Sequence, residues 1–161
     1  LFTEKPLAAS VEAGQKIVAA LERSGTWYMV GYHKRSDPAT MYAKAEIDRL
    51  VRSGELGKLR YVRILMPAGD WVAGGFNDLI RTDEPMPEPK SQPPASDMGE
   101  ATYREYVAFV NYYIHQVNLM RHLLGEPYRV AYADPSGVLM AVRSESGVAG
   151  TIEMSHQKTE K

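Results

Sequence analysis

Two chemically capable side chains stand far apart in this sequence. Lys5 lies in the triplet Glu4-Lys5-Pro6 near the first residue, and His115 lies in a long helical pattern in the second half. A lysine ammonium can polarise an oxygen atom, and an imidazole titrates near working pH and can accept or donate a proton. The central prediction is that the fold brings Lys5 and His115 to one shared cleft, where they act on one substrate.

The residues around Lys5 predict that it lies at the end of a strand. Pro6 fixes its own φ, lacks an N–H and pushes Lys5 toward an extended conformation. A helical pattern follows from the N-cap Ser10 to a stop at Gly25. The β-branched and aromatic stretch 26–32 is predicted to be a buried strand. Strand, helix and strand predict a βαβ unit, and open parallel sheets bind ligands at the carboxyl ends of their strands.

A polar stripe is predicted on the helix that carries His115, over residues 101–124. Its members are spaced four, three and four residues apart, which places them on one helical face: Asn111, His115, Asn118 and His122. The stripe is either a solvent face or the wall of a wet cavity. No charged residue lies between Val107 and Leu119, and this favours the cavity wall.

His115 is then a candidate general acid–base, and Asn111, one turn earlier, could orient its ring or hold a substrate hydroxyl. A core histidine without catalytic function is the alternative for His115. No metal site is predicted, because His115 and His122 lie two turns apart with no carboxylate between them on the face.

Further candidates lie outside these two segments. His33 and Arg35 follow a predicted strand end and could reach a substrate, or they could belong to a solvated polar junction. Trp71 lies between glycines in the proline-rich stretch 67–99, which predicts a long loop. Its indole could close over a sugar ring or serve as a packing anchor.

The rest of the pattern predicts a second layer. A helix is expected over 39–53, with Tyr42, Ile47, Leu50 and Val51 facing inward. A strand with one wet face is expected over 58–66. Strands joined by short turns, and therefore antiparallel, are expected over 128–133, 138–143 and 147–155. A parallel βαβ unit thus precedes an α+β layer with an antiparallel sheet.

Composition excludes several classes of function. Lys and Arg number 19 against 20 Asp and Glu, so neither nucleic acid nor an anionic membrane is expected as a partner. The absence of cysteine excludes disulfides and cysteine nucleophiles and fits a cytoplasmic location. No apolar run reaches the roughly 18 residues of a membrane span.

The ordered set of motifs resembles the Gfo/Idh/MocA oxidoreductases, the glucose–fructose oxidoreductase and inositol dehydrogenase family. The matching stretches are 3–8 around Glu4-Lys5-Pro6, 30–38, the turn at 54–58 and the histidine helix at 113–127. They occur in the order of the family, so the resemblance spans most of the chain. The resemblance implies NAD or NADP bound in a Rossmann domain and a sugar or polyol substrate. It places Glu4, Lys5 and Pro6 at the nicotinamide. Lys5 would polarise the reacting oxygen, and His115 would move the proton.

Two departures from the family pattern are visible. Asn111 and Asn118 stand where the family usually has aspartates; an amide can bind a sugar hydroxyl but cannot raise the basicity of the imidazole as a carboxylate would. No Gly-x-Gly-x-x-Gly motif follows a strand anywhere in the chain, so the phosphate cradle of a dinucleotide site is absent from this sequence. We therefore expect the chain to be part of a longer protein.

The predicted fold class is the end of a Rossmann-type parallel sheet followed by a C-terminal α+β domain with a largely antiparallel sheet covered by helices. Residues 1–37 are assigned to the first domain and 38–161 to the second. A homo-oligomer through the C-terminal sheet is expected from the resemblance. Two alternatives stay open: an NAD-dependent glycoside hydrolase on the same scaffold, and a non-catalytic oligomerisation module.

Overall fold

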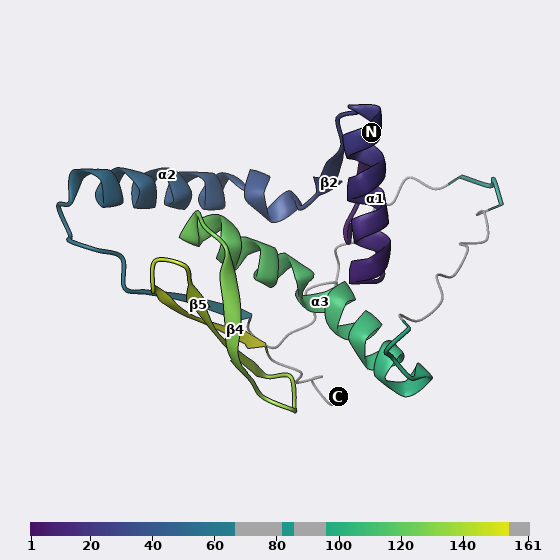
Figure 1. Cartoon of the computed structure of the whole chain (residues 1–161). Coiled ribbons are helices and arrows are strands. Elements are labelled where there is room, and N and C mark those ends of the chain that lie inside the picture. Colours follow the sequence, from purple (N-terminus) through teal and green to yellow (C-terminus); the bar gives the residue numbers. More distant parts are fainter. Residues whose placement is uncertain (67–81, 86–95, 155–161) are drawn as a thin grey trace.

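The computed structural model of the protein describes residues 1–66, 82–85 and 96–154. Figure 1 shows a long helix, α3, lying between a set of N-terminal elements and a second sheet. The N-terminal elements are β1 (Phe2–Glu4), α1 (Val11–Ser24), β2 (Met29–Gly31), the 3-10 turn η1 (His33–Ser36) and α2 (Pro38–Ser53). The remaining elements are β3 (Tyr61–Met66), α3 (Glu100–Leu124), β4 (Tyr128–Ala133), β5 (Leu139–Ser144) and β6 (Ala149–Met154). The predicted fold class is confirmed.

The first sheet is the βαβ unit that the sequence predicts. β1 pairs with β2 in parallel, and α1 connects them. The Oγ of Ser10 accepts a hydrogen bond from the N–H of Ala13 at 3.1 Å, and Gly25 ends the helix with a φ of 62°. Lys5 directly follows β1, at its carboxyl end, and the Lys5–Pro6 peptide bond is cis.

The predicted buried strand over 26–32 is too long and too buried. β2 covers only Met29–Gly31; Trp27 is 69% exposed and Met29 is 45% exposed. Apolar and β-branched content correctly indicates a strand, but a sheet of two strands has too little neighbouring structure to cover both faces. Among the described residues, β1 is the strand that pairs with β2.

α2 begins and ends as predicted, but its inward face was partly wrong. Asp37 caps the helix by accepting from the N–H of Ala39 at 2.9 Å. Ile47 and Leu50 are half-buried, whereas Tyr42 is 75% exposed and Val51 is 53% exposed. Tyr42 and Ile47 are five positions apart, so at about 100° per residue their side chains point about 140° apart around the helix axis. Tyr42 therefore lies on the side away from Ile47. Val51 belongs to the last turns of α2, which extend beyond the end of α3 in Figure 1.

The second sheet has the order β3-β6-β5-β4. β3 pairs with β6 in parallel, while β6 pairs with β5, and β5 with β4, in antiparallel fashion. The sheet is therefore largely antiparallel, as predicted. Along β3, exposed and buried residues alternate, which confirms a strand with one face in water.

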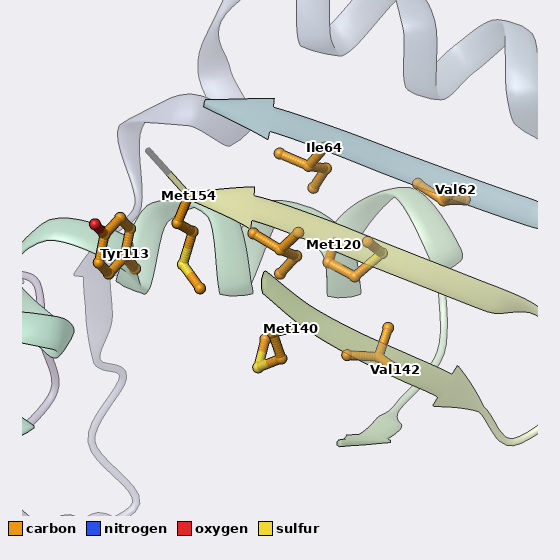
Figure 2. Packing of buried hydrophobic residues seen from close by; sticks show 8 residues of the cluster. Val62, Ile64, Tyr113, Met120, Met140, Val142 and Met154 are labelled. Carbon is orange, nitrogen blue, oxygen red and sulfur yellow. The ribbon is translucent and has the colours of Figure 1, made fainter. Parts of the chain in front are cut away.

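The core forms where α3 packs on one face of this sheet. Met120 of α3 and Ile152 of β6 are both fully buried. Figure 2 shows the cluster that surrounds them, drawn from α3, β3, β5 and β6: Val62, Ile64, Tyr113, Met140, Val142 and Met154. Packing this face of α3 against the sheet orients the opposite side of the helix toward β1 and η1. No helix in the described part of the chain has the length and apolar character needed to cross a membrane.

Gly150 permits the close approach of α3 to the sheet. A Cβ at this position would lie 2.9 Å from Met120 Cε and Sδ and 2.9 Å from Val142 Cγ2. The thioether of Met120 can move, but the branched side chain of Val142 cannot move without disturbing β5.

We predict that Gly150→Ala lowers the free energy of unfolding by about 1–3 kcal/mol, the usual cost of overpacking a core. Urea denaturation followed by circular dichroism measures this change. Gly14→Ala is the control, because the Cβ added there meets only Leu7 Cδ2 at 3.7 Å, an ordinary van der Waals distance. Equal stability of the two variants would show that the close approach is not restrictive.

Candidate functional site

The polar stripe of α3 meets the N-terminal elements. Asn111 contacts Lys5, His115 contacts His33, and Asn118 contacts Arg35. Asn111 is exposed, whereas His115, Asn118 and His122 are half-buried. The stripe is therefore not a simple solvent face, and η1 and the end of β1 lie against it.

Lys5 reaches α3 across 106 positions of sequence. Its Nζ donates to the backbone oxygen of Asn111 at 2.9 Å and to the Oδ1 of the same residue at 3.1 Å. Both acceptors belong to one residue, so the ammonium is held at a defined point on the helix. That point lies one helical turn before His115, which places the ammonium and the imidazole in one neighbourhood.

The imidazole of His115 is held in a neutral state. Burial lowers its pKa to about 4, and the nearby charges of His33, Lys5 and Lys34 add to this effect, while Glu4 opposes it. The ring centroids of His115 and His33 lie 4.5 Å apart in an edge-to-face arrangement. The Nδ1 of His115 is buried without a hydrogen-bond partner. At neutral pH this ring can accept a proton.

Arg35 makes the third contact between the N-terminal segments and α3. Its Nε donates to the Oδ1 of Asn118 at 2.6 Å. The next stripe residue, His122, also has a lowered pKa, because of burial first and then the charges of Arg35 and Lys44, with Asp48 opposing. Two of the residues predicted after the strand end, His33 and Arg35, thus both lie against the stripe.

Two residues at or near the site were missed by the sequence argument. Lys34 lies between His33 and Arg35, and its charge acts on His115; its place in the same polar run was a usable signal. Gln116 is 8% exposed, and its Oε1 is buried without a partner. Nothing in the spacing of the polar stripe indicates Gln116, because it faces the sheet side of α3 among apolar neighbours.

The remaining predicted site residues are Glu4, Pro6 and Trp71. The Oε2 of Glu4 accepts from the N–H of Lys5 at 3.3 Å, and Glu4 is exposed. Pro6 is half-buried. Trp71 lies outside the described residues. Within the described ranges, no group of three His, Asp or Glu side chains could hold a metal ion.

The proteins that this chain resembles are dehydrogenases and other oxidoreductases. The chain is 27% identical to the scyllo-inositol 2-dehydrogenase (NAD(+)) of Bacillus subtilis over 169 residues. That match covers 96% of this chain and 41% of the relative. The chain therefore spans less than half of the curated relative it matches. No protein-family model matches it.

Solved structures share the fold. A myo-inositol dehydrogenase from Corynebacterium glutamicum has a TM-score of 0.53 at 17% identity, over 98% of this chain and 43% of that one. The WlbA dehydrogenase of Bordetella pertussis, in complex with NADH and UDP-GlcNAcA, has a TM-score of 0.56 at 19% identity, over 99% of this chain and 45% of that one. An oxidoreductase from Agrobacterium radiobacter, in complex with NAD+, L-tartaric acid and magnesium, has a TM-score of 0.59 at 16% identity, over 99% of this chain and 42% of that one. The resemblance inferred from the sequence motifs is confirmed.

The depressed pKa of His115 predicts a pH-dependent stability. The unfolded chain protonates this residue near its ordinary pKa of 6.5, and the folded chain does so only near 4. Between these values the unfolded state binds the extra proton, so the free energy of unfolding falls as pH falls from 6.5 to about 4. His115→Gln is expected to flatten this decline, measured as melting temperature between pH 7 and pH 4.

Lys34→Gln is the graded comparison for this measurement. It keeps the imidazole but removes one repelling charge, so it should flatten the decline less than His115→Gln does. A decline of unchanged slope in His115→Gln would contradict the assigned burial of the ring.

Proposed function

We propose that this chain, whose fold and relatives are those of the Gfo/Idh/MocA oxidoreductases, forms part of an NAD(P)-dependent enzyme that oxidises or reduces a hydroxyl-bearing carbon of a sugar or polyol. The relatives named above include two inositol dehydrogenases and a dehydrogenase in complex with UDP-GlcNAcA, and two of the structural neighbours hold a nicotinamide cofactor. The observation that carries the proposal is the contact between Lys5 and Asn111, which sets an ammonium one turn from a neutral imidazole.

The cofactor fits one end of this arrangement. Glu4, Lys5 and Pro6 stand at the carboxyl end of β1, the edge at which parallel sheets bind nucleotides. We propose that these residues hold the nicotinamide end of NAD or NADP. The sequence contains no glycine-rich phosphate loop, so the diphosphate must be bound by other residues. When bound, the nicotinamide supplies the hydride acceptor or donor.

In this proposal, side chains of this chain transfer the proton. In the oxidation direction, Lys5 donates a hydrogen bond to the substrate hydroxyl oxygen and stabilises the negative charge that develops there. His115, neutral at physiological pH, accepts the hydroxyl proton as the carbonyl forms. In the reverse direction His115 returns that proton to the oxygen. His33 packs edge-to-face on His115 and limits the orientations of its ring.

The side-chain amides of Asn111 and Asn118 form hydrogen bonds but do not exchange protons. Asn111 fixes Lys5 through its carbonyl oxygens, and Asn118 holds the Nε of Arg35. We propose that their amide N–H groups, together with Arg35 and His33, contact the hydroxyls of the substrate. Trp71 is proposed as a residue that covers the sugar ring.

Activity with NAD or NADP and a panel of sugars and polyols tests this proposal on the natural full-length protein. Lys5→Ala and His115→Ala are each expected to lower kcat by about 10²–10⁴-fold, the usual contribution of one acid–base group. Lys16→Ala is the control, because Lys16 is an exposed lysine on α1. Melting temperatures confirm that each variant folds. Near-normal kcat in either site variant sinks the assignment, and release of free sugar from an aryl glycoside without net NADH identifies a hydrolase instead.

The open face of the second sheet is proposed as a contact between copies of this chain. Tyr61 is 50% exposed, Leu65 is 58% exposed and Tyr132 is 51% exposed. Tyr61 and Leu65 alternate along β3 with the buried Val62 and Ile64, so they point away from α3. Tyr132 pairs with Ala141, which lies between the buried Met140 and Val142, and so belongs to the same open face. Arg63 and Glu153 pair on the same face, with both hydrogen bonds at 2.7 Å.

Leu65→Glu is expected to dissociate this assembly, because a second copy would have to bury the new carboxylate. Sedimentation equilibrium measures the mass. Leu56→Glu is the control, since Leu56 is 74% exposed in the turn after α2 and away from the sheet. An unchanged mass for Leu65→Glu would show that this face is not the interface.

A further inference from the structure

The site gathers positive charge that the described chain does not neutralise. Lys5 follows β1, and Lys34 and Arg35 lie on η1, so three cations stand beside the stripe of α3. Glu4 is the carboxylate whose charge acts on His115 from the same side. Lys5 and Lys34 outnumber Glu4 as charges acting on the imidazole, and Arg35 adds a third positive charge farther along the stripe, at Asn118. The stripe itself adds no carboxylate, since residues 107–119 contain none.

The contacts of these cations are with neutral oxygens. Lys5 donates to two oxygens of Asn111, and the Nε of Arg35 donates to the amide oxygen of Asn118. An amide oxygen satisfies a hydrogen bond but leaves the full charge of its donor. In the described residues, the two Nη atoms of Arg35 donate no hydrogen bond to another residue.

Four other cations of the described residues are paired with carboxylates. Ion pairs join Lys44 to Asp48, Arg49 to Glu46 and Glu55, Arg63 to Glu153, and Arg104 to Glu100. Within the described ranges, Lys5, Lys34 and Arg35 take part in no ion pair. Other described cations, among them Lys16, Arg52 and Lys58, also form no ion pair, whereas Lys5, Lys34 and Arg35 lie together beside the stripe where the substrate is proposed to bind.

From this arrangement we infer that the substrate is an anionic sugar, one whose carboxylate or phosphate is bound by Arg35 and Lys34 while Lys5 and His115 act on a hydroxyl. This inference rests on the proposed function and names its substrate class. Arg35 offers a planar pair of Nη donors suited to bidentate binding of either group. The neutral Asn118 is what keeps Arg35 available, since a carboxylate there would pair with the guanidinium.

Anion binding would also change the state of His115. Burial is the main cause of the lowered pKa of the ring, and Lys5 and Lys34, two of the cations beside the proposed anion site, add to it. A bound anion would offset the effect of these two charges and bring the pKa of the imidazole closer to the operating pH, where a general base is most effective. The groups facing the ring are Glu4, Lys5, His33 and Lys34.

The test compares three sugars that differ in one group: D-glucose, D-glucuronate and D-glucose 6-phosphate. On the natural full-length protein with NAD, kcat/KM for one of the two anions should exceed that for D-glucose by about tenfold or more at low ionic strength, the scale of a screened charge contact. The preferred anion identifies whether a carboxylate or a phosphate is bound. Equal or better use of D-glucose overturns the inference while leaving the proposed function intact.

Asn118→Asp is the decisive variant. It sets a carboxylate against the Nε of Arg35 and should lower the ratio of anionic to neutral kcat/KM by about tenfold. Gln15→Glu is the matched control, because it adds the same charge at an exposed position of α1; its ratio should stay that of the parent. If Asn118→Asp raises the KM for NAD and leaves the ratio unchanged, the cations serve the cofactor and the inference is wrong.

Equilibrium binding separates this inference from a failure of the proposed function. If no sugar reduces NAD, the proposed function fails, and isothermal titration of the same protein with D-glucuronate, D-glucose 6-phosphate and D-glucose still decides the substrate charge. Tighter binding of an anion, weakened by Asn118→Asp but not by Gln15→Glu, supports the inference. Binding of all three sugars with equal affinity overturns it.

Discussion

The contact between Lys5 and Asn111 is the constraint on which the site depends. It joins the end of the first strand to the middle of α3 through two hydrogen bonds at 2.9 and 3.1 Å. Neither segment has a chemical function alone, since a strand-end lysine without a partner is a solvated charge and an isolated polar stripe is a helix surface. Held together, they place an ammonium and an imidazole within one helical turn.

α3 can serve this site because its two faces have separate tasks. One face carries Met120 and Tyr113 into the core against the second sheet (Figure 2). The absence of a side chain at Gly150 allows the helix to pack closely there. That packing fixes the rotation of the helix about its axis. The stripe at 111–122 consequently faces β1 and η1, and its polar groups meet partners that come from the first 36 residues.

The sequence predicts this fold well where local rules act, and less well where burial depends on neighbours. Caps at Ser10, Asp37 and Gly25 set the helix ends, and these were predictable from residue type. The exposure of Trp27 and Tyr42 was not, because an apolar side chain carries no information about which partner covers it. In the site, helical spacing grouped Asn111, His115 and Asn118 on one face. It could not show that Asn111 contacts Lys5, that His115 contacts His33, or that Asn118 contacts Arg35.

Burial is the first cause of the low pKa of His115, and the positive charges of His33, Lys5 and Lys34 add to it. Aspartates at positions 111 and 118 would neutralise Lys5 and Arg35 and stabilise a protonated ring at 115. With amides there, the same hydrogen-bond geometry is kept while the site stays positive, and the ring loses its proton more readily. An imidazole with a pKa of about 4 accepts a proton weakly in the empty site. Under the proposed function, an anionic substrate would oppose the neighbouring positive charges and raise this pKa, so we propose that substrate binding favours proton transfer.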